Sequence, residues 1–138
     1  MQRMYFGRPI NTYDEPISTR LIQKILEEFP GWEIEDPNQP CHQDGYKEYV
    51  KRTGKGMDYY YIEVLPNCDG GVFLPFPDGS WGAGVYGEAS FLQAHHRPVY
   101  QITPSGIITP AELSRVRALT IDETRARIRT PDNKLIPY

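Results

Sequence analysis

Short apolar runs alternate along this chain with longer segments in which apolar side chains recur every three or four residues. Runs of the first kind are typical of strands buried on both faces, and segments of the second kind are typical of amphipathic helices. Alternation of the two favours parallel strands joined by helical connections. The predicted strands are Met4–Phe6, Trp32–Glu35, Val72–Leu74, Pro98–Ile102 and a short edge strand at Ile107–Ile108.

The helical segments complete this pattern. Pro30 ends the first predicted helix, and Thr120 with Glu123 three residues later forms a capping box at the start of the last one. We therefore expect an α/β fold, a flavodoxin-like three-layer sandwich with a four- or five-stranded parallel sheet. The predicted helices are Ile17–Phe29, Tyr46–Arg52, Met57–Leu65, a short helix after the glycine-rich loop at 77–84, Pro110–Val116 and Ile121–Arg129, with loops at 36–45 and 130–138.

Length and composition narrow the class of protein to which this chain can belong. With 138 residues, we expect a single domain over 1–138. A net charge of −3, with lysine and arginine spread along the chain, gives no footprint for a nucleic acid polymer. No apolar stretch approaches the roughly 20 residues of a membrane helix, and the segment MQRMYFGRPI lacks the apolar core of a secretory signal. Cys41 and Cys68 have no metal-like spacing, so a reducing cytoplasm is expected.

The segment from Cys68 to Tyr100 carries the strongest indication of function. It joins an apolar strand, a glycine-rich loop, a helix and a second strand. Ligands of open α/β sheets bind beyond the carboxyl ends of the strands, so this loop is expected at the binding edge. Glu88 is predicted in the first turn of the helix, where the helix dipole favours an ionised carboxylate. Such a carboxylate can attack a sugar carbon or stabilise an oxocarbenium-like charge; the alternative is a purely structural first-turn glutamate.

Other residues are candidates for the same site. Asp58, at the start of a predicted helix, can protonate a departing base or simply stabilise the helix N-terminus. Asp78 and Ser80 can contact a sugar hydroxyl or a phosphate, although PDGS is also ordinary turn chemistry. Gly82 and Gly84 belong to the same glycine-lined binding edge.

The loop FGRPIN after the first predicted strand is a candidate phosphate site. Gly7 allows close approach, Arg8 supplies positive charge, and backbone amides up to Ile10 and beyond can hold a phosphate. The loop is neither a dinucleotide fingerprint nor a P-loop. His42 is a candidate contact to a base, with a solvated loop histidine as the alternative. No serine-histidine-aspartate order, CxxC pair or HExxH motif is present, so we expect neither a triad hydrolase nor a zinc enzyme. Attack on a sugar carbon by a carboxylate needs no metal or organic cofactor, so we expect none.

Taken in chain order, these segments resemble the nucleoside 2-deoxyribosyltransferase superfamily, which includes N-glycosidases of nucleoside 5′-monophosphates. The resemblance covers YFGRPIN, CDGGVFLPF with its glycine loop, and GVYGEASFLQAHHRPVYQI. It implies that Glu88 is the nucleophile, that Asp58 assists the leaving base, and that Gly84 and Ala89 flank the start of the helix. The chain departs from the family pattern in having Ala89 after Glu88, and Gly82 where members carry a polar residue.

The resemblance implies cleavage or transfer at the N-glycosidic bond of a nucleoside or nucleoside 5′-monophosphate. An NAD-cleaving or nucleotide-sensing domain on a similar fold is the alternative. A homodimer or higher homo-oligomer is also implied, with Tyr138 closing the pocket of its own or a neighbouring subunit; the alternative for Tyr138 is a tail packed on the surface. Exposed tyrosines would supply contact area: Tyr46, Tyr49, Tyr59 and Tyr60.

Overall fold

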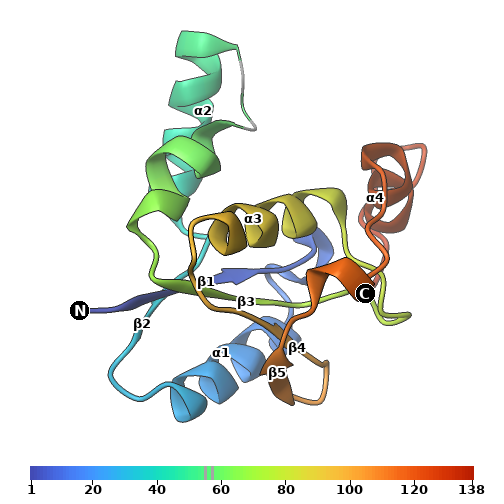
Figure 1. Ribbon diagram of the computed structural model, residues 1–138. Coiled ribbons are helices and arrows are strands. Elements are labelled where there is room, and N and C mark those ends of the chain that lie inside the picture. Colours follow the sequence, from blue (N-terminus) through green and yellow to red (C-terminus); the bar gives the residue numbers. More distant parts are fainter. Residues whose placement is uncertain (55, 57) are drawn as a thin grey trace.

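The sheet predicted from the apolar runs is present in the computed structural model, which describes residues 1–54, 56 and 58–138. Five strands lie in the order β2-β1-β3-β4-β5 (Figure 1). The first four are mutually parallel, and β5 runs antiparallel to β4. The α/β class and the mostly parallel sheet are therefore confirmed. The strands are β1 (Arg3–Gly7), β2 (Glu33–Glu35), β3 (Gly70–Phe73), β4 (Val99–Ile102) and β5 (Ile108–Pro110).

Strand side chains alternate between two apolar cores. Met4 and Phe6 pack with Leu21 and Ile25 of α1 (Pro16–Glu28), on one face of the sheet. Tyr5 packs on the other face, in a core to which α3 (Ala83–Ala94) contributes three side chains. Figure 1 shows α1 and α3 on opposite sides of the sheet. This alternation follows from the two-residue period of a strand and brings Tyr5 under α3.

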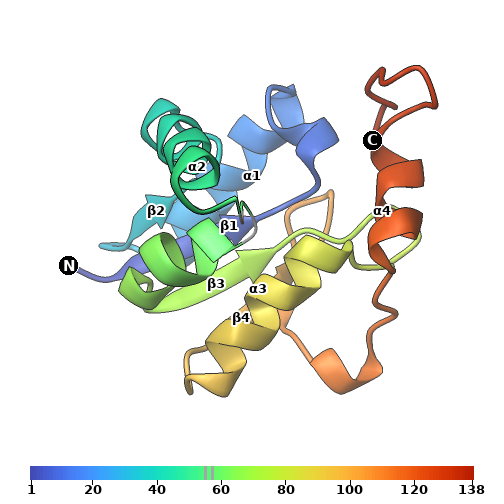
Figure 2. The same cartoon turned by 90° about the horizontal axis from the view of Figure 1, so that it is seen from above.

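The segment between β2 and β3 differs from its prediction. A helix, α2 (Pro40–Thr53), begins six residues before the predicted Tyr46 and occupies much of the predicted loop. Proline suits the first turn of a helix, and Gly54 ends α2 in the left-handed conformation with φ 75°. Part of the next predicted helix lies outside the described residues; within it, Tyr60–Val64 forms a π-helix. Figure 2 shows α2, this segment and α3 on the same face of the sheet.

The predicted helix Pro110–Val116 is wrong. Pro110 ends β5, paired with Tyr100 of β4, and only a short 3₁₀ turn follows, at Leu113–Arg115. Strand pairing overrides the local helix preference there. The last predicted helix is confirmed as α4 (Ile121–Ile128), and the capping box between Thr120 and Glu123 is present.

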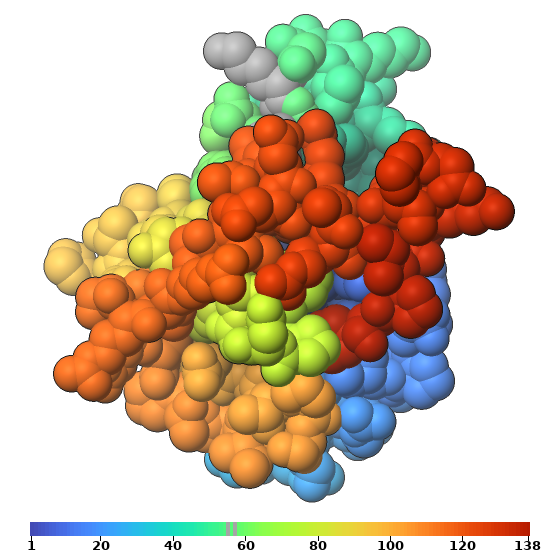
Figure 3. Space-filling view, turned by 90° about the vertical axis from the view of Figure 1, so that its right-hand side faces the viewer, coloured from blue at the N-terminus to red at the C-terminus, as the bar shows by residue number. Residues whose placement is uncertain are grey.

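The tail after α4 lies on the surface of the molecule (Figure 3), bonded to the loops that follow β1 and β3. Asn11 donates to the Ile136 carbonyl at 2.8 Å, and the Tyr138 hydroxyl donates to the Pro75 carbonyl at 2.6 Å. Burial raises the pKa of Tyr138 to about 12. Tyr138 therefore packs against its own chain.

The expectation of four surface tyrosines is corrected for two of them. Tyr49 and Tyr59 are buried, because they stack with each other between α2 and the π-helix. Tyr46 is exposed. Across the described ranges, no helix has the length and apolar character needed to cross a bilayer.

Candidate functional site

Glu88 lies in the second turn of α3, and its side chain reaches the sheet. The predicted position in the first turn is wrong, because α3 already begins at Ala83. The Tyr5 hydroxyl, from β1, donates a hydrogen bond to Oε2 of Glu88. A strand and a helix far apart in the sequence thus converge on one carboxyl group.

The expected ionisation of Glu88 is also corrected. Burial raises the pKa of Glu88 to about 8, and the hydrogen bond from Tyr5 opposes that rise. The helix dipole acts within the first turn, so it offers the carboxylate of the second turn little compensation for lost hydration. In the free protein at pH 7, the protonated form of Glu88 is therefore the major one.

Three further tyrosines lie within electrostatic range of this carboxyl group. For Tyr13, Tyr60 and Tyr61, burial raises the side-chain pKa, and the charge of Glu88 is the next cause in each case. Tyr60 reaches a pKa of about 12. All three therefore remain neutral hydroxyl groups near pH 7, each able to donate and accept a hydrogen bond. We call Glu88, Tyr5, Tyr13, Tyr60 and Tyr61 the Glu88 cluster.

Two glycines of α3 shape the surroundings of Glu88. A Cβ atom at Gly87 would overlap the Tyr61 hydroxyl, so only glycine lets Tyr61 lie against the helix there. A Cβ atom at Gly84 would meet nothing within 4 Å. Gly84 precedes Glu88 by four residues and therefore lies on the same face of the helix. The space at Gly84 is therefore open on the face of α3 that carries Glu88.

Asp58 acts electrostatically on Tyr61 of the cluster. The charges of Glu88 and Asp58 both raise the pKa of Tyr61, which places the phenol within electrostatic range of both carboxyl groups. Asp58 is half-buried. The two predicted catalytic residues thus share one tyrosine neighbour.

Arg8, the candidate phosphate contact, is buried, and its hydrogen-bond donors are used by groups of the protein itself. Its guanidinium donates to Ser18 Oγ at 2.8 Å, to the Phe6 carbonyl at 3.3 Å, and to Asp36 at 2.8 Å. It also lies over the rings of Phe6 and Tyr13, 4.7 Å from each centroid. Only 3% of Arg8 is exposed, so its positive charge is neutralised by Asp36 inside the protein and does not face solvent.

In the rest of the FGRPIN loop, too, the groups expected to hold a phosphate are used within the protein. A Cβ atom at Gly7 would overlap the Phe73 ring, so the close approach that Gly7 permits is used by the core. Ile10 begins a 3₁₀ turn and is exposed. The amides of Thr12 and Tyr13 are bonded within that turn, at 3.0 and 3.1 Å.

Asp78 and Ser80 lie apart from Glu88, in the loop after β3. Asp78 accepts bonds from the amide and hydroxyl of Ser80 and from Arg127 of α4; these bonds hold its pKa well below the usual range. The loop lines a cavity of about 430 Å³ beyond the carboxyl ends of β3 and β4, together with Arg115 and Arg117. Gly82 packs beside Thr124, whose hydroxyl accepts the first amide of α3 at 2.9 Å.

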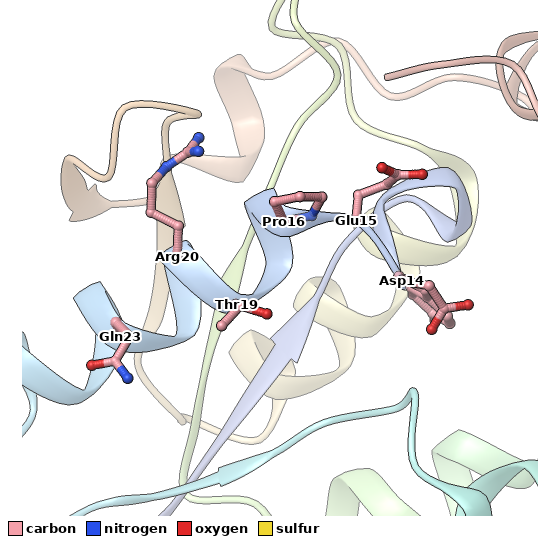
Figure 4. Close-up of a pocket in the computed structure, with 7 residues that line it drawn as sticks. Asp14, Glu15, Pro16, Thr19, Arg20 and Gln23 are labelled. Carbon is pink, nitrogen blue, oxygen red and sulfur yellow. The ribbon is translucent and has the colours of Figure 1, made fainter.

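A second cavity, of about 760 Å³, lies beside the start of α1 (Figure 4). Asp14 and Glu15 lie where the chain enters the helix, and Arg20 follows along it. Tyr13 lines this cavity and also belongs to the Glu88 cluster. Glu88 itself lines neither of the two cavities.

His42, the candidate contact to a base, is bonded through both ring nitrogens to other parts of the protein. Its Nε2 bonds Glu35 of β2, and its Nδ1 lies 3.0 Å from the Tyr59 hydroxyl. The Tyr59 ring in turn lies 5.0 Å from that of Tyr60, centroid to centroid. His42 therefore ties α2 and the π-helix to the sheet.

Sequence reasoning missed the tyrosines of the cluster. Tyr5 could have been found, because in a strand it must face the side opposite Met4 and Phe6. Tyr60 and Tyr61 fall within the YYY run, which contains no recognisable motif. Comparison of the chain with protein-family models, with curated proteins and with solved structures finds no match.

Proposed function

We propose that this protein cleaves, or transfers at, the N-glycosidic bond of a nucleoside, with Glu88 as the nucleophile. The observation that carries the proposal is the convergence of Tyr5 and Glu88 under α3, beside the open space at Gly84. A carboxyl group held by one phenol, with others in electrostatic range, suits a site where charge develops on a sugar.

The proposed reaction has two displacements. The Glu88 carboxylate attacks C1′, and the C1′–N bond breaks with its electron pair leaving on the base. Asp58 supplies the proton that the departing base nitrogen takes up, directly or across the Tyr61 hydroxyl. Water or a second nucleobase then attacks C1′ of the glycosyl ester and gives its proton to the Asp58 carboxylate, while the bond from C1′ to Glu88 breaks and releases the Glu88 carboxylate.

The phenol of Tyr5 has a specific role in this scheme. Its hydrogen bond favours the ionised form of Glu88 and fixes the second oxygen of the carboxyl group. The free oxygen is then the nucleophile.

We further propose that the scaffold is of the flavodoxin-like three-layer type, whose ligands bind beyond the carboxyl ends of the parallel strands.

A panel assay tests the proposal. Wild type, Glu88→Gln and the exposed control Glu112→Gln are incubated with nucleosides, nucleoside 5′-monophosphates and NAD, and released base is measured by chromatography. Base from a nucleoside or monophosphate, retained by the control and lost by Glu88→Gln, supports the proposal. Release of nicotinamide alone, or no base from any compound, refutes it.

A further inference from the structure

The cavity beyond the carboxyl ends of β3 and β4 has the size of a small-molecule site. Its volume is about 430 Å³, and small-molecule sites span roughly 300–1,000 Å³. Three segments form its walls: the loop after β3, the end of β4, and residues 115–117. Figure 3 shows the loop after β3, in yellow-green, bordered by orange segments of the chain from β4 onward. Ligands of open α/β sheets bind at this end of the strands, so the position also suits a ligand.

The wall formed by the loop after β3 is held by bonds within the loop. The Phe76 amide donates to the Ser80 carbonyl, and the Gly79 amide donates to the Phe76 carbonyl, both at 2.8 Å. Asp78 accepts bonds from the amide and hydroxyl of Ser80 at 3.0 and 2.6 Å, and pairs with Arg127 at 2.7 Å. The wall is therefore formed before a ligand arrives, and Arg127 already neutralises the negative charge of Asp78.

Two arginines line the opposite wall of this cavity, Arg115 and Arg117. Their side chains are largely exposed, at 81% and 68%, and each faces one exposed glutamate, at 3.0 Å for Arg115 and 3.8 Å for Arg117. Exposed ion pairs of this kind contribute little, and a guanidinium has five N–H donors. Both arginines can therefore turn donors toward an anion, and guanidinium groups bind phosphate and carboxylate oxygens through paired hydrogen bonds.

The remaining lining combines apolar and polar groups. Ile102 and Val116 supply apolar surface. Gln101 lines the cavity with a carboxamide that can donate and accept hydrogen bonds. Trp81 also lines it, and among the described residues its buried Nε1 has no hydrogen-bond acceptor. A ligand that joins a charged oxygen group to a compact apolar body matches this combination.

We propose that this cavity binds a small organic oxyanion. Arg115 and Arg117 hold its phosphate or carboxylate group, and its apolar body lies against Ile102 and Val116. The site is separate from the Glu88 cluster, because Glu88 does not line the cavity. The inference therefore goes beyond the proposed function and does not depend on it.

A titration of the wild-type protein tests the proposal. Calorimetry compares phenyl phosphate, benzoate and uncharged phenol, which share one ring. We expect phenyl phosphate or benzoate to bind at least tenfold more tightly than phenol, and this binding to weaken with added salt. The tighter of the two anions identifies the charged group that the site prefers. A preference below tenfold, or no binding of either anion, overturns the proposal.

Two variants test the role of the arginines. Arg115→Gln and Arg117→Gln should each weaken binding of the preferred anion at least fivefold, because each removes one guanidinium from the cavity. The control Arg125→Gln removes the same charge from an exposed residue of α4 that does not line the cavity, and should bind as the wild type does. Melting curves check that all three variants fold. Unchanged binding in both folded cavity variants contradicts the assignment.

Chemical-shift mapping by NMR locates the anion on the wild-type protein. We expect the amide signals of Gly79, Thr103 and Arg117 to move, and Glu88→Gln to bind the anion as tightly as the wild type. Shifts centred on α3, or loss of binding in Glu88→Gln, would place the anion at the Glu88 cluster and overturn the proposal. Neither result alters the base-release assay, which tests the proposed function separately.

Discussion

At the scale of single residues, Glu88 is subject to two opposing influences. Burial raises its pKa to about 8, and the phenol of Tyr5 lowers it. A nucleophile must be ionised, so the proposed reaction uses the minor form of Glu88 at pH 7. The pH dependence of the reaction therefore reports directly on this residue.

We predict that kcat/KM rises with pH and levels off above about pH 8. Below that value, each pH unit should lower kcat/KM about tenfold, because the ionised fraction falls tenfold. Initial rates at low substrate concentration from pH 5.5 to 9.5 give this profile. If kcat/KM falls between pH 6 and 8 instead, the protonated form is active and Glu88 acts as an acid.

Tyr5→Phe provides a second residue-scale prediction. The variant keeps the ring in the core and removes the hydroxyl that lowers the pKa of Glu88. The midpoint of the kcat/KM profile should therefore move to higher pH. An unmoved midpoint in a folded Tyr5→Phe protein would show that the hydrogen bond does not tune the carboxyl group.

At the scale of elements, α3 offers a matched pair of substitutions. Gly84→Ala should stabilise the protein by up to about 1 kcal/mol, because alanine is the better helix former and the space beside Gly84 is open. Gly87→Ala should destabilise it by about 1–3 kcal/mol, because the new methyl group displaces Tyr61. Urea unfolding of both variants measures the difference. Equal stabilities would contradict the described contact between Tyr61 and α3.

Some helices and strands could be predicted because neighbouring residues in the sequence determine them, whereas others depend on segments that are distant in the sequence. Strand alternation and the capping box of Thr120 depend on neighbours in the sequence, so the sheet and α4 could be predicted. Pro110 joins a strand because β4 lies beside it, which no local pattern reveals. The proton state of Glu88 likewise depends on the exact start of α3 and on burial by distant segments.

At the scale of the whole molecule, the raised pKa of Glu88 links stability to pH. An unfolded glutamate has its ordinary pKa of 4.5, and the folded one has about 8, so the folded protein binds this proton more tightly. The stability that the proton contributes is complete below about pH 4.5 and is lost as pH rises to about 8.

We predict that Glu88→Gln, which mimics the protonated side chain, gains stability over the wild type as pH rises from 5 to 8. The gain should reach a few kcal/mol, since each unit of pKa difference contributes about 1.4 kcal/mol. Urea unfolding of both proteins at several pH values measures it. A stability difference that does not vary with pH would show that the pKa of Glu88 is not raised by folding.

The central claim is that Glu88 attacks the sugar, and a covalent glycosyl ester is its direct consequence. The protein is quenched with acid during turnover of a nucleoside, digested, and its peptides are weighed by mass spectrometry. We expect one peptide, containing Glu88, to be heavier by the glycosyl group, and no such peptide from Glu88→Gln. Base release by a fully active Glu88→Gln, or an ester on a different residue, would contradict it.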